Sequence, residues 1–161
     1  MIWYGRRGCS IDMAYLVIRL RGTINVPHWA RHTLALLNLR RRFNATIVPE
    51  REPYIGMLRT VKDYVAWCKV DAGFIKQLLE KRGKYKYEDI SKLGFSSIDA
   101  LAEALANDSI MLSRLEGMKP WFVLAPPRGG FKRSSKHMYS DGGILGENKE
   151  LLELASRMIY A

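Results

Sequence analysis

Residues 14–21 alternate between two sides of an extended chain, with Leu16, Ile18 and Leu20 on one side. The other side carries Tyr15, Val17, Arg19 and Arg21. A period of two with β-branched residues is typical of a strand, and Gly22 is suited to end it. We therefore predict a strand over residues 14–21 that presents three aromatic or basic positions on one face.

Apolar positions then recur at helical spacing. From Val26 onward the pattern predicts a helix that Asn25 caps and that Pro27 enters in its first turn. A second strand is predicted at residues 45–48, a second helical stripe at residues 54–65 and a third strand at residues 66–70. The order strand, helix, strand, helix, strand with short connections favours an α/β sandwich with helices on one face of the sheet.

The second half of the chain has a different pattern. Residues 71–118 are predicted to form a helical insertion, in which Asp71 caps one helix and Gly83 closes it. Residues 120–124 are predicted to return as a fourth strand, followed by a basic loop and a terminal helix over residues 149–158. The expected organisation is an N-terminal arm or an upstream start codon (1–12), a core (13–70), the insertion (71–118) and a basic extension (119–161).

Charge points to a polyanionic partner. The 161 residues carry a formal net charge of +10, and residues 13–49 contain no Asp or Glu. Residues 126–137 also lack acids, and their basic side chains are Arg128, Lys132, Arg133, Lys136 and His137. Gly129 and Gly130 would let the backbone approach a sugar-phosphate chain. We predict that this loop binds RNA and becomes ordered on it; the alternative is a solvated surface loop.

A second basic group lies at residues 40–42, where three arginines are adjacent. They would complement the dipole at the C-terminus of the first helix, or at least one of them would contact a partner; the sequence leaves both interpretations open. Arg31 lies in the same acid-free stretch. The strand face with Tyr15 and Arg19 could stack RNA bases, although cover by the helical insertion or by RNA backbone is the better interpretation.

No catalytic or metal-binding pattern is present. His28 and His32 have helical i, i+4 spacing but no third ligand, and Cys68 lies in an apolar strand where a buried thiol is expected. Residues 142–146 are glycine-rich but lack the Lys-Ser/Thr of a phosphate-binding loop. We therefore predict no enzyme activity, cofactor, metal or small-molecule substrate. The chain's cysteine count fits a reducing cytoplasm, and no apolar run approaches the about 18 to 20 residues that span a bilayer.

Motifs spread along the chain after residue 12 resemble one family in their order and spacing. They are Arg19-Leu20-Arg21-Gly22 with Asn25, Thr33-Leu34, Pro49-Glu50, Gly56-Met57-Leu58, Tyr64-Val65-Ala66-Trp67, Leu78-Leu79-Glu80-Lys81-Arg82-Gly83, Pro127-Arg128-Gly129-Gly130-Phe131-Lys132, Gly142-Gly143 with Gly146, and Arg157-Met158. In these residues the chain is similar to the long, archaeal and eukaryotic form of the L-thirty family of large-subunit ribosomal proteins.

The resemblance implies a mixed α/β (α+β) fold: a ferredoxin-like βαβαβ core, a helical insertion, a further C-terminal strand and a basic extension. It also implies a structural role in the cytoplasmic ribosome, with large-subunit ribosomal RNA near the 5S RNA and neighbouring large-subunit proteins as partners. By position, the loop at residues 128–132 and the Arg19–Gly22 turn near Asn25 should lie against RNA.

Two departures from the family pattern concern Cys68, where many relatives have glycine, and the absence of a lysine-rich N-terminal extension, which favours an archaeal source. Two other hypotheses remain: a free-standing RNA-binding regulator with the same fold, and an RNA-processing enzyme. Neither would be a stoichiometric component of the ribosome, so sedimentation separates them from the ribosomal hypothesis.

Overall fold

A computed structural model describes residues 14–83 and 87–160, without the side chains of residues 87–89. The expected arm at residues 1–12 lies outside the described residues. The strands are β1 (Ala14–Arg19), β2 (Asn44–Val48), β3 (Val65–Val70), β4 (Phe122–Val123), β5 (Ser134–Met138) and β6 (Gly143–Glu147). The helices are α1 (His28–Leu36), α2 (Glu52–Thr60), α3 (Ala72–Arg82), α4 (Tyr87–Lys92), α5 (Ile98–Ala106) and α6 (Leu151–Ile159), with 3₁₀ turns η1 (Leu112–Arg114) and η2 (Tyr139–Asp141).

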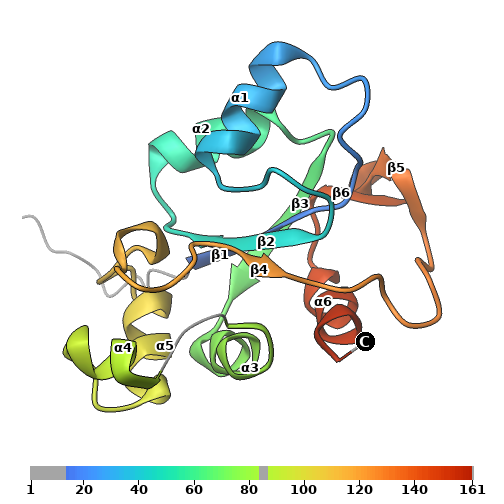
Figure 1. The fold of residues 1–161 in the computed structure, drawn as a ribbon. Helices are drawn as coiled ribbons and strands as arrows, with labels where there is room; N and C mark the ends of the chain where they lie inside the picture. The colour runs from blue at the N-terminus through green and yellow to red at the C-terminus, as the bar shows by residue number, and fades with distance from the viewer. Residues whose placement is uncertain (1–13, 84–86, 161) are drawn as a thin grey trace, which may run out of the picture.

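The described strands form one sheet in the order β4-β2-β1-β3-β6-β5 (Figure 1). The central strand, β1, pairs antiparallel with both β2 and β3, which places Leu16 beside Ile47 and Cys68. The first five elements therefore run β1-α1-β2-α2-β3, as the sequence pattern predicted. The mixed α/β class is confirmed, and the βαβαβ core is consistent with the ferredoxin-like expectation.

Helices cover both faces of this sheet: the two helices of the βαβαβ core, α1 and α2, lie together on one face as predicted, and later helices cover the other face. Tyr15 and Val17 pack with α1 and α2 on one face. Leu16 and Ile18 pack with α3, α5 and α6 on the other, and Figure 1 shows these two helical layers on opposite sides of the strands. The physical reason lies in β1 itself, because all its residues are buried and neither side of the strand is polar enough to face water.

Several element boundaries differ from the predicted ones. The first strand ends at Arg19 rather than Arg21, and the residue that precedes α1 is Pro27 rather than Asn25, whose φ of 56° lies in the left-handed region. Helix α2 ends at Thr60, so Val65 begins β3 instead of continuing the helical stripe. Ser97 caps α5, because the Ala100 N–H donates to Ser97 Oγ over 3.3 Å.

The sequence reading missed β5 and β6, which it assigned to the basic loop and to a glycine turn. These strands run parallel, and β6 also pairs parallel with β3. Their close approach explains the glycines, since a Cβ on Gly143 would overlap the His137 carbonyl. Gly146 has a φ of +83°, and a Cβ there would lie 2.6 Å from Met138 Cε. The returning fourth strand is present but short, at Phe122–Val123.

Candidate RNA interface

Arg19 is buried at the end of β1, with 3% of its surface exposed. Its Nη1 donates to the Leu39 carbonyl over 2.8 Å and to the Arg40 carbonyl over 3.1 Å. Its Nη2 donates to Gly22 O over 2.9 Å, and its Nε donates to Arg21 O over 3.2 Å. Burial lowers the pKa of this guanidinium below its ordinary value. The predicted RNA contact is therefore corrected: the Arg19 side chain holds the backbone that leads into residues 40–42.

The arginines at residues 40–42 do not complement a helix dipole, since α1 ends at Leu36 without a basic residue in its last turn. Arg40 and Arg41 are exposed. Arg42 Nε donates to the Leu20 carbonyl over 2.9 Å, and its guanidinium lies 4.6 Å from the centroid of the Phe43 ring. The dipole interpretation is wrong, and the run instead forms an exposed turn between α1 and β2.

An aromatic pair connects this turn to the basic loop. The rings of Phe43 and Phe131 stack with centroids 6.3 Å apart and an interplanar angle of 25°. The Leu124 N–H also donates to the Phe43 carbonyl over 3.0 Å. The two basic segments that the sequence singled out separately are therefore brought together in space.

The glycine turn of the loop is held by backbone and side-chain hydrogen bonds. Gly129 and Gly130 both have positive φ, and the Gly130 N–H donates to the Pro127 carbonyl over 3.0 Å. From α6, Arg157 Nη1 donates to the carbonyls of Arg128 and Gly130, each over 3.1 Å. Residues 127–130 thus form a turn that α6 holds, and the Arg128 side chain is exposed.

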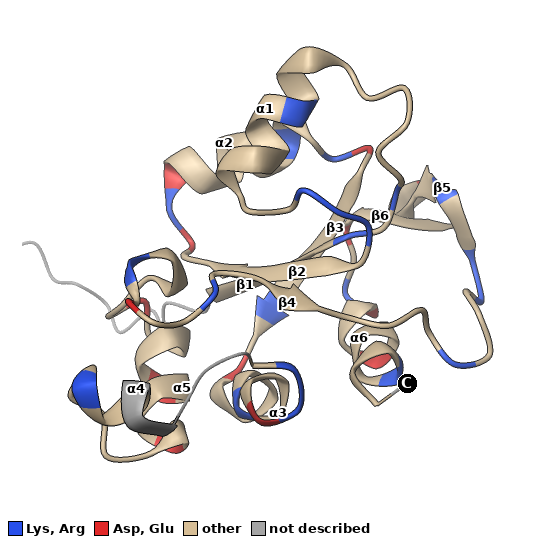
Figure 2. Ribbon diagram, viewed as in Figure 1, with Lys and Arg blue, Asp and Glu red and all other residues tan. Residues whose placement is uncertain are grey.

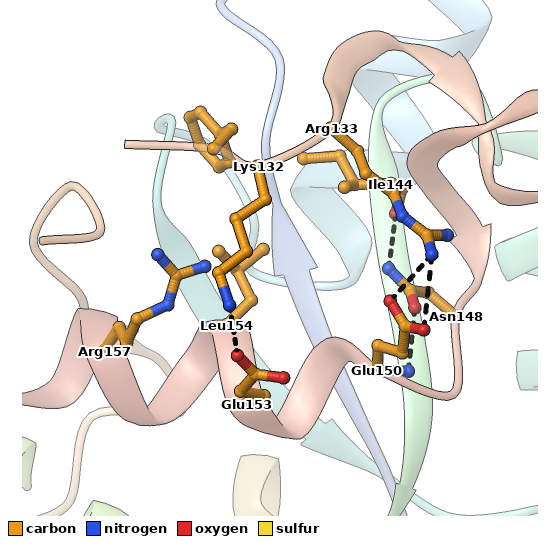
Figure 3. A pocket seen from close by; sticks show the side chains of 9 residues that line it. Lys132, Arg133, Ile144, Asn148, Glu150, Glu153, Leu154 and Arg157 are labelled. Carbon is orange, nitrogen blue, oxygen red and sulfur yellow. Dashed lines mark hydrogen bonds and ion pairs between the residues drawn. The ribbon is translucent and has the colours of Figure 1, made fainter. Parts of the chain in front are cut away.

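Two cations of the loop have acidic partners on α6 or just before it. Lys132 Nζ lies 2.8 Å from Glu153 Oε1, and Arg133 Nη2 lies 3.3 Å from Glu150 (Figure 3). The hydrogen bond from Lys132 lowers the pKa of the Glu153 carboxyl. A small cavity of 210 Å³ lies between these pairs. The local sequence, which lacks acids, suggested that only a polyanion would neutralise the loop. Instead, two of its cations pair with acidic residues of the protein itself.

The remaining predicted residues lie around this surface. Lys136 and His137 are exposed on β5. Arg21 lies 5.9 Å from the centroid of the Tyr64 ring, and Asn25 is exposed. Arg31 is exposed and lines a hollow of 370 Å³ together with Arg40. Figure 2 shows Lys and Arg along the turn after α1 and the chain between β4 and β5, whereas α5 carries Asp and Glu but no Lys or Arg.

A groove beside the arginine turn was missed by the sequence analysis. Its volume is 570 Å³, and it is lined by Asn38, Arg40, Arg41, Arg42, Asn44, Lys119, Trp121 and Val123. The signal was present in the alternation around Phe122, whose neighbours Trp121 and Val123 must face the opposite side. The sequence places Trp121 and Val123 in a returning strand, and the residues that complete the groove are distant from them along the chain.

The histidines and the cysteine that the sequence analysis considered do not form a metal or catalytic site within the described residues. His28 and His32 are exposed on α1, and the described part of the chain contains no group of three or more metal-ligating side chains. Burial raises the pKa of the Cys68 thiol to about 12, which agrees with the predicted inert thiol. None of the helices in the described ranges is long and apolar enough to cross a membrane.

Comparison with known proteins gives a consistent result. The family model described as ribosomal protein L30p/L7e matches residues 15–65. A relative from Cenarchaeum symbiosum, named large ribosomal subunit protein uL30, is 48% identical over 91% of this chain and 98% of its own length. Relatives of the same name from Nitrosopumilus maritimus and Korarchaeum cryptofilum are 45% and 42% identical, over 91% and 89% of this chain and 98% and 93% of theirs.

Proposed function

Because the chain belongs to the ribosomal protein L30p/L7e family, we propose that it is a structural constituent of the large ribosomal subunit that binds ribosomal RNA. Its role there is structural rather than enzymatic, and its partners are large-subunit RNA and neighbouring ribosomal proteins. Its place of action is accordingly the ribosome of the cytoplasm. The finer position, near the 5S RNA, is a proposal that rests on the family resemblance.

The observation that best supports RNA binding is the contact between Phe43 and Phe131, because it brings two basic segments together on one surface. Arg40, Arg41 and Arg128 are exposed on this surface. Phosphate oxygens accept hydrogen bonds from guanidinium groups in a bidentate geometry, and each neutralised phosphate releases condensed counterions. We therefore propose that the surface recognises the RNA backbone by charge and shape rather than by sequence.

The remaining predicted contacts extend this surface in two directions. Lys136 and His137 continue it along β5, with Gly129 and Gly130 as the points where the backbone comes nearest to RNA. Arg21, Asn25 and Arg31 continue it around the hollow beside α1; their side chains are exposed or half-buried, unlike that of Arg19. These assignments are part of the proposal.

Sedimentation of the endogenous protein tests the function. Large subunits are separated on a sucrose gradient after a moderate salt wash, and the amount of this chain is quantified against other large-subunit proteins. We expect one copy per subunit. Recovery mainly in ribosome-free fractions, bound to a selected RNA, would contradict the proposal and support a free-standing regulator.

A further inference from the structure

We propose that the groove between the arginine turn and Trp121 binds an unpaired RNA nucleotide, with its base on the Trp121 ring and its phosphates on the arginines. This inference rests on the proposed function, since it names the form of RNA that this part of the surface takes. Residues 40–42, Lys119, Trp121 and Val123 line the groove. None of Lys119, Trp121 and Val123 was among the residues expected to bind RNA.

The backbone of β4 directs Trp121 into the groove. Phe122 points into the core and has 1% of its surface exposed. Because side chains alternate along an extended chain, Trp121 and Val123 point to the opposite face, and Val123 is 42% exposed there. The pairing of Val123 with Asn44 fixes the distance between this edge and the turn that carries residues 40–42.

The lining favours a nucleotide over other ligands. The residues that line the groove include four cations, at positions 40, 41, 42 and 119, and no acid. An apolar floor of Trp121 and Val123 lies within the same groove, whose volume of 570 Å³ is within the range of small-ligand sites. An aromatic ring next to a basic track is the arrangement by which proteins bind single-stranded RNA, since the ring stacks a base and the cations bind its phosphates.

Lys119 occupies part of this site in the protein alone. Its Nζ lies 5.7 Å from the centroid of the Trp121 ring. An exposed cation–π contact is weaker than stacking of a base on an indole, so an incoming base displaces the ammonium group. The displaced lysine remains beside the groove, where it can bind the phosphate of the same nucleotide.

The nucleotide must be unpaired. In an A-form duplex each base is stacked between its neighbours and paired on its edge, so its face is not available to an aromatic side chain. A nucleotide in a loop, a bulge or a strand end can present that face. The groove therefore distinguishes single-stranded from double-stranded RNA, whereas the exposed cations alone bind either form.

The experiment compares the full-length wild type with three variants, Trp121→Ala, Trp121→Phe and Trp29→Ala, in binding to oligouridylate and to an RNA duplex of the same length. Trp29→Ala is the control, because Trp29 is an exposed tryptophan (53%) on α1 that does not line the groove, whereas Trp121 is half-buried in it. Trp121→Ala should weaken oligouridylate binding about 5- to 100-fold. Trp121→Phe should lose less, and Trp29→Ala should bind within about two-fold of wild type.

Two further readouts separate stacking from loss of charge or fold. The difference in tryptophan fluorescence between the wild type and Trp121→Phe reports on Trp121. Oligouridylate should quench this part of the fluorescence, and the duplex should not. The slope of log affinity against log salt should stay unchanged in Trp121→Ala, since no cation is removed. The inference would be overturned if both Trp121 variants bound oligouridylate with wild-type affinity, or if they lost as much affinity for the duplex as for oligouridylate. If Trp121→Ala does not fold, the affinity of Trp121→Phe decides the question. Absence of the wild-type chain from large subunits would instead overturn the proposed function.

Discussion

Arg19 Nη1 donates a 2.8 Å hydrogen bond to the Leu39 carbonyl, which joins the end of the central strand to the turn that carries the arginine run. The same side chain donates to three further backbone carbonyls. A buried guanidinium is tolerated only where its donors are satisfied, and here carbonyl oxygens take the place of water. An arginine that the sequence suggested for RNA contact is thus a structural support for the neighbouring contact residues.

Replacing Arg19 with alanine should destabilise the protein, because the Leu39 and Gly22 carbonyls would lose their donors. We expect the free energy of unfolding to fall by about 2–4 kcal/mol, as for other buried charged hydrogen bonds. Urea unfolding followed by circular dichroism measures this change. Arg31→Ala is the control, since that side chain is exposed and should alter stability by less than about 1 kcal/mol. Equal effects of the two variants would argue against the support role.

Neutralising Arg128, Lys132 and Arg133 together, as Arg128→Gln, Lys132→Gln and Arg133→Gln, should weaken incorporation into large subunits while the core stays folded. The pairs of Lys132 with Glu153 on α6 and of Arg133 with Glu150 just before α6 are largely exposed, and each contributes no more than about 1 kcal/mol to stability. Sucrose gradients and circular dichroism check the two expectations. The double variant Glu150→Gln/Glu153→Gln serves as the control, because it breaks the same ion pairs but retains the cations. Normal incorporation of the triple variant would remove the loop from the interface.

Phe43→Ala should weaken RNA binding without changing any charge. The stacked pair of Phe43 and Phe131 keeps the two basic segments at a fixed separation, and an aromatic pair contributes about 0.5–1.5 kcal/mol beyond its burial. Titration with large-subunit RNA should show lower affinity and an unaltered salt slope. Leu36→Ala removes an exposed apolar side chain from α1 and should bind as the wild type does. A Phe43→Ala variant with wild-type affinity would mean that the segments act independently.

The contact between Lys132 and Glu153 predicts a pH dependence. The pKa of Glu153 is lowered in the folded protein, mainly by the hydrogen bond from Lys132 and then by its charge, so the ionised carboxylate is favoured. The stabilisation from this pair is therefore present above the unfolded pKa and is lost as pH falls through the folded pKa. In Lys132→Met the pKa of Glu153 should rise toward its ordinary value, which carboxyl NMR titration measures. Arg133→Met, whose cation pairs with Glu150 instead, should leave the pKa of Glu153 low.

Cys68 should be unreactive in the folded protein. Its thiol is buried and its pKa is raised to about 12, so the nucleophilic thiolate is nearly absent at neutral pH. In a Cys9→Ser background, a thiol reagent at pH 8 should label Cys68 only after denaturant is added. Rapid labelling of the native protein would show that β3 opens readily or that the thiol is accessible.

The sequence predicted those elements whose apolar positions repeat regularly, from β1 to α3, since burial imposes that repeat. It failed for β5 and β6, because their pairing depends on Gly143 and Gly146 rather than on a hydrophobic alternation. The same limit applies to the interface. The charge of Arg128 and Lys132 is visible in the sequence, but the stack of Phe43 on Phe131 and the groove at Trp121 join segments that are far apart along the chain.

The hydrogen bonds from Arg157 to the Arg128 and Gly130 carbonyls have a consequence for biosynthesis. Translation produces the glycine turn before it produces α6, so for a short interval the newly made turn has neither its clamp nor the carboxylates of Glu150 and Glu153. A chain that ended before α6 would therefore keep the cations of this segment but would lose the hydrogen bonds that give its backbone its shape.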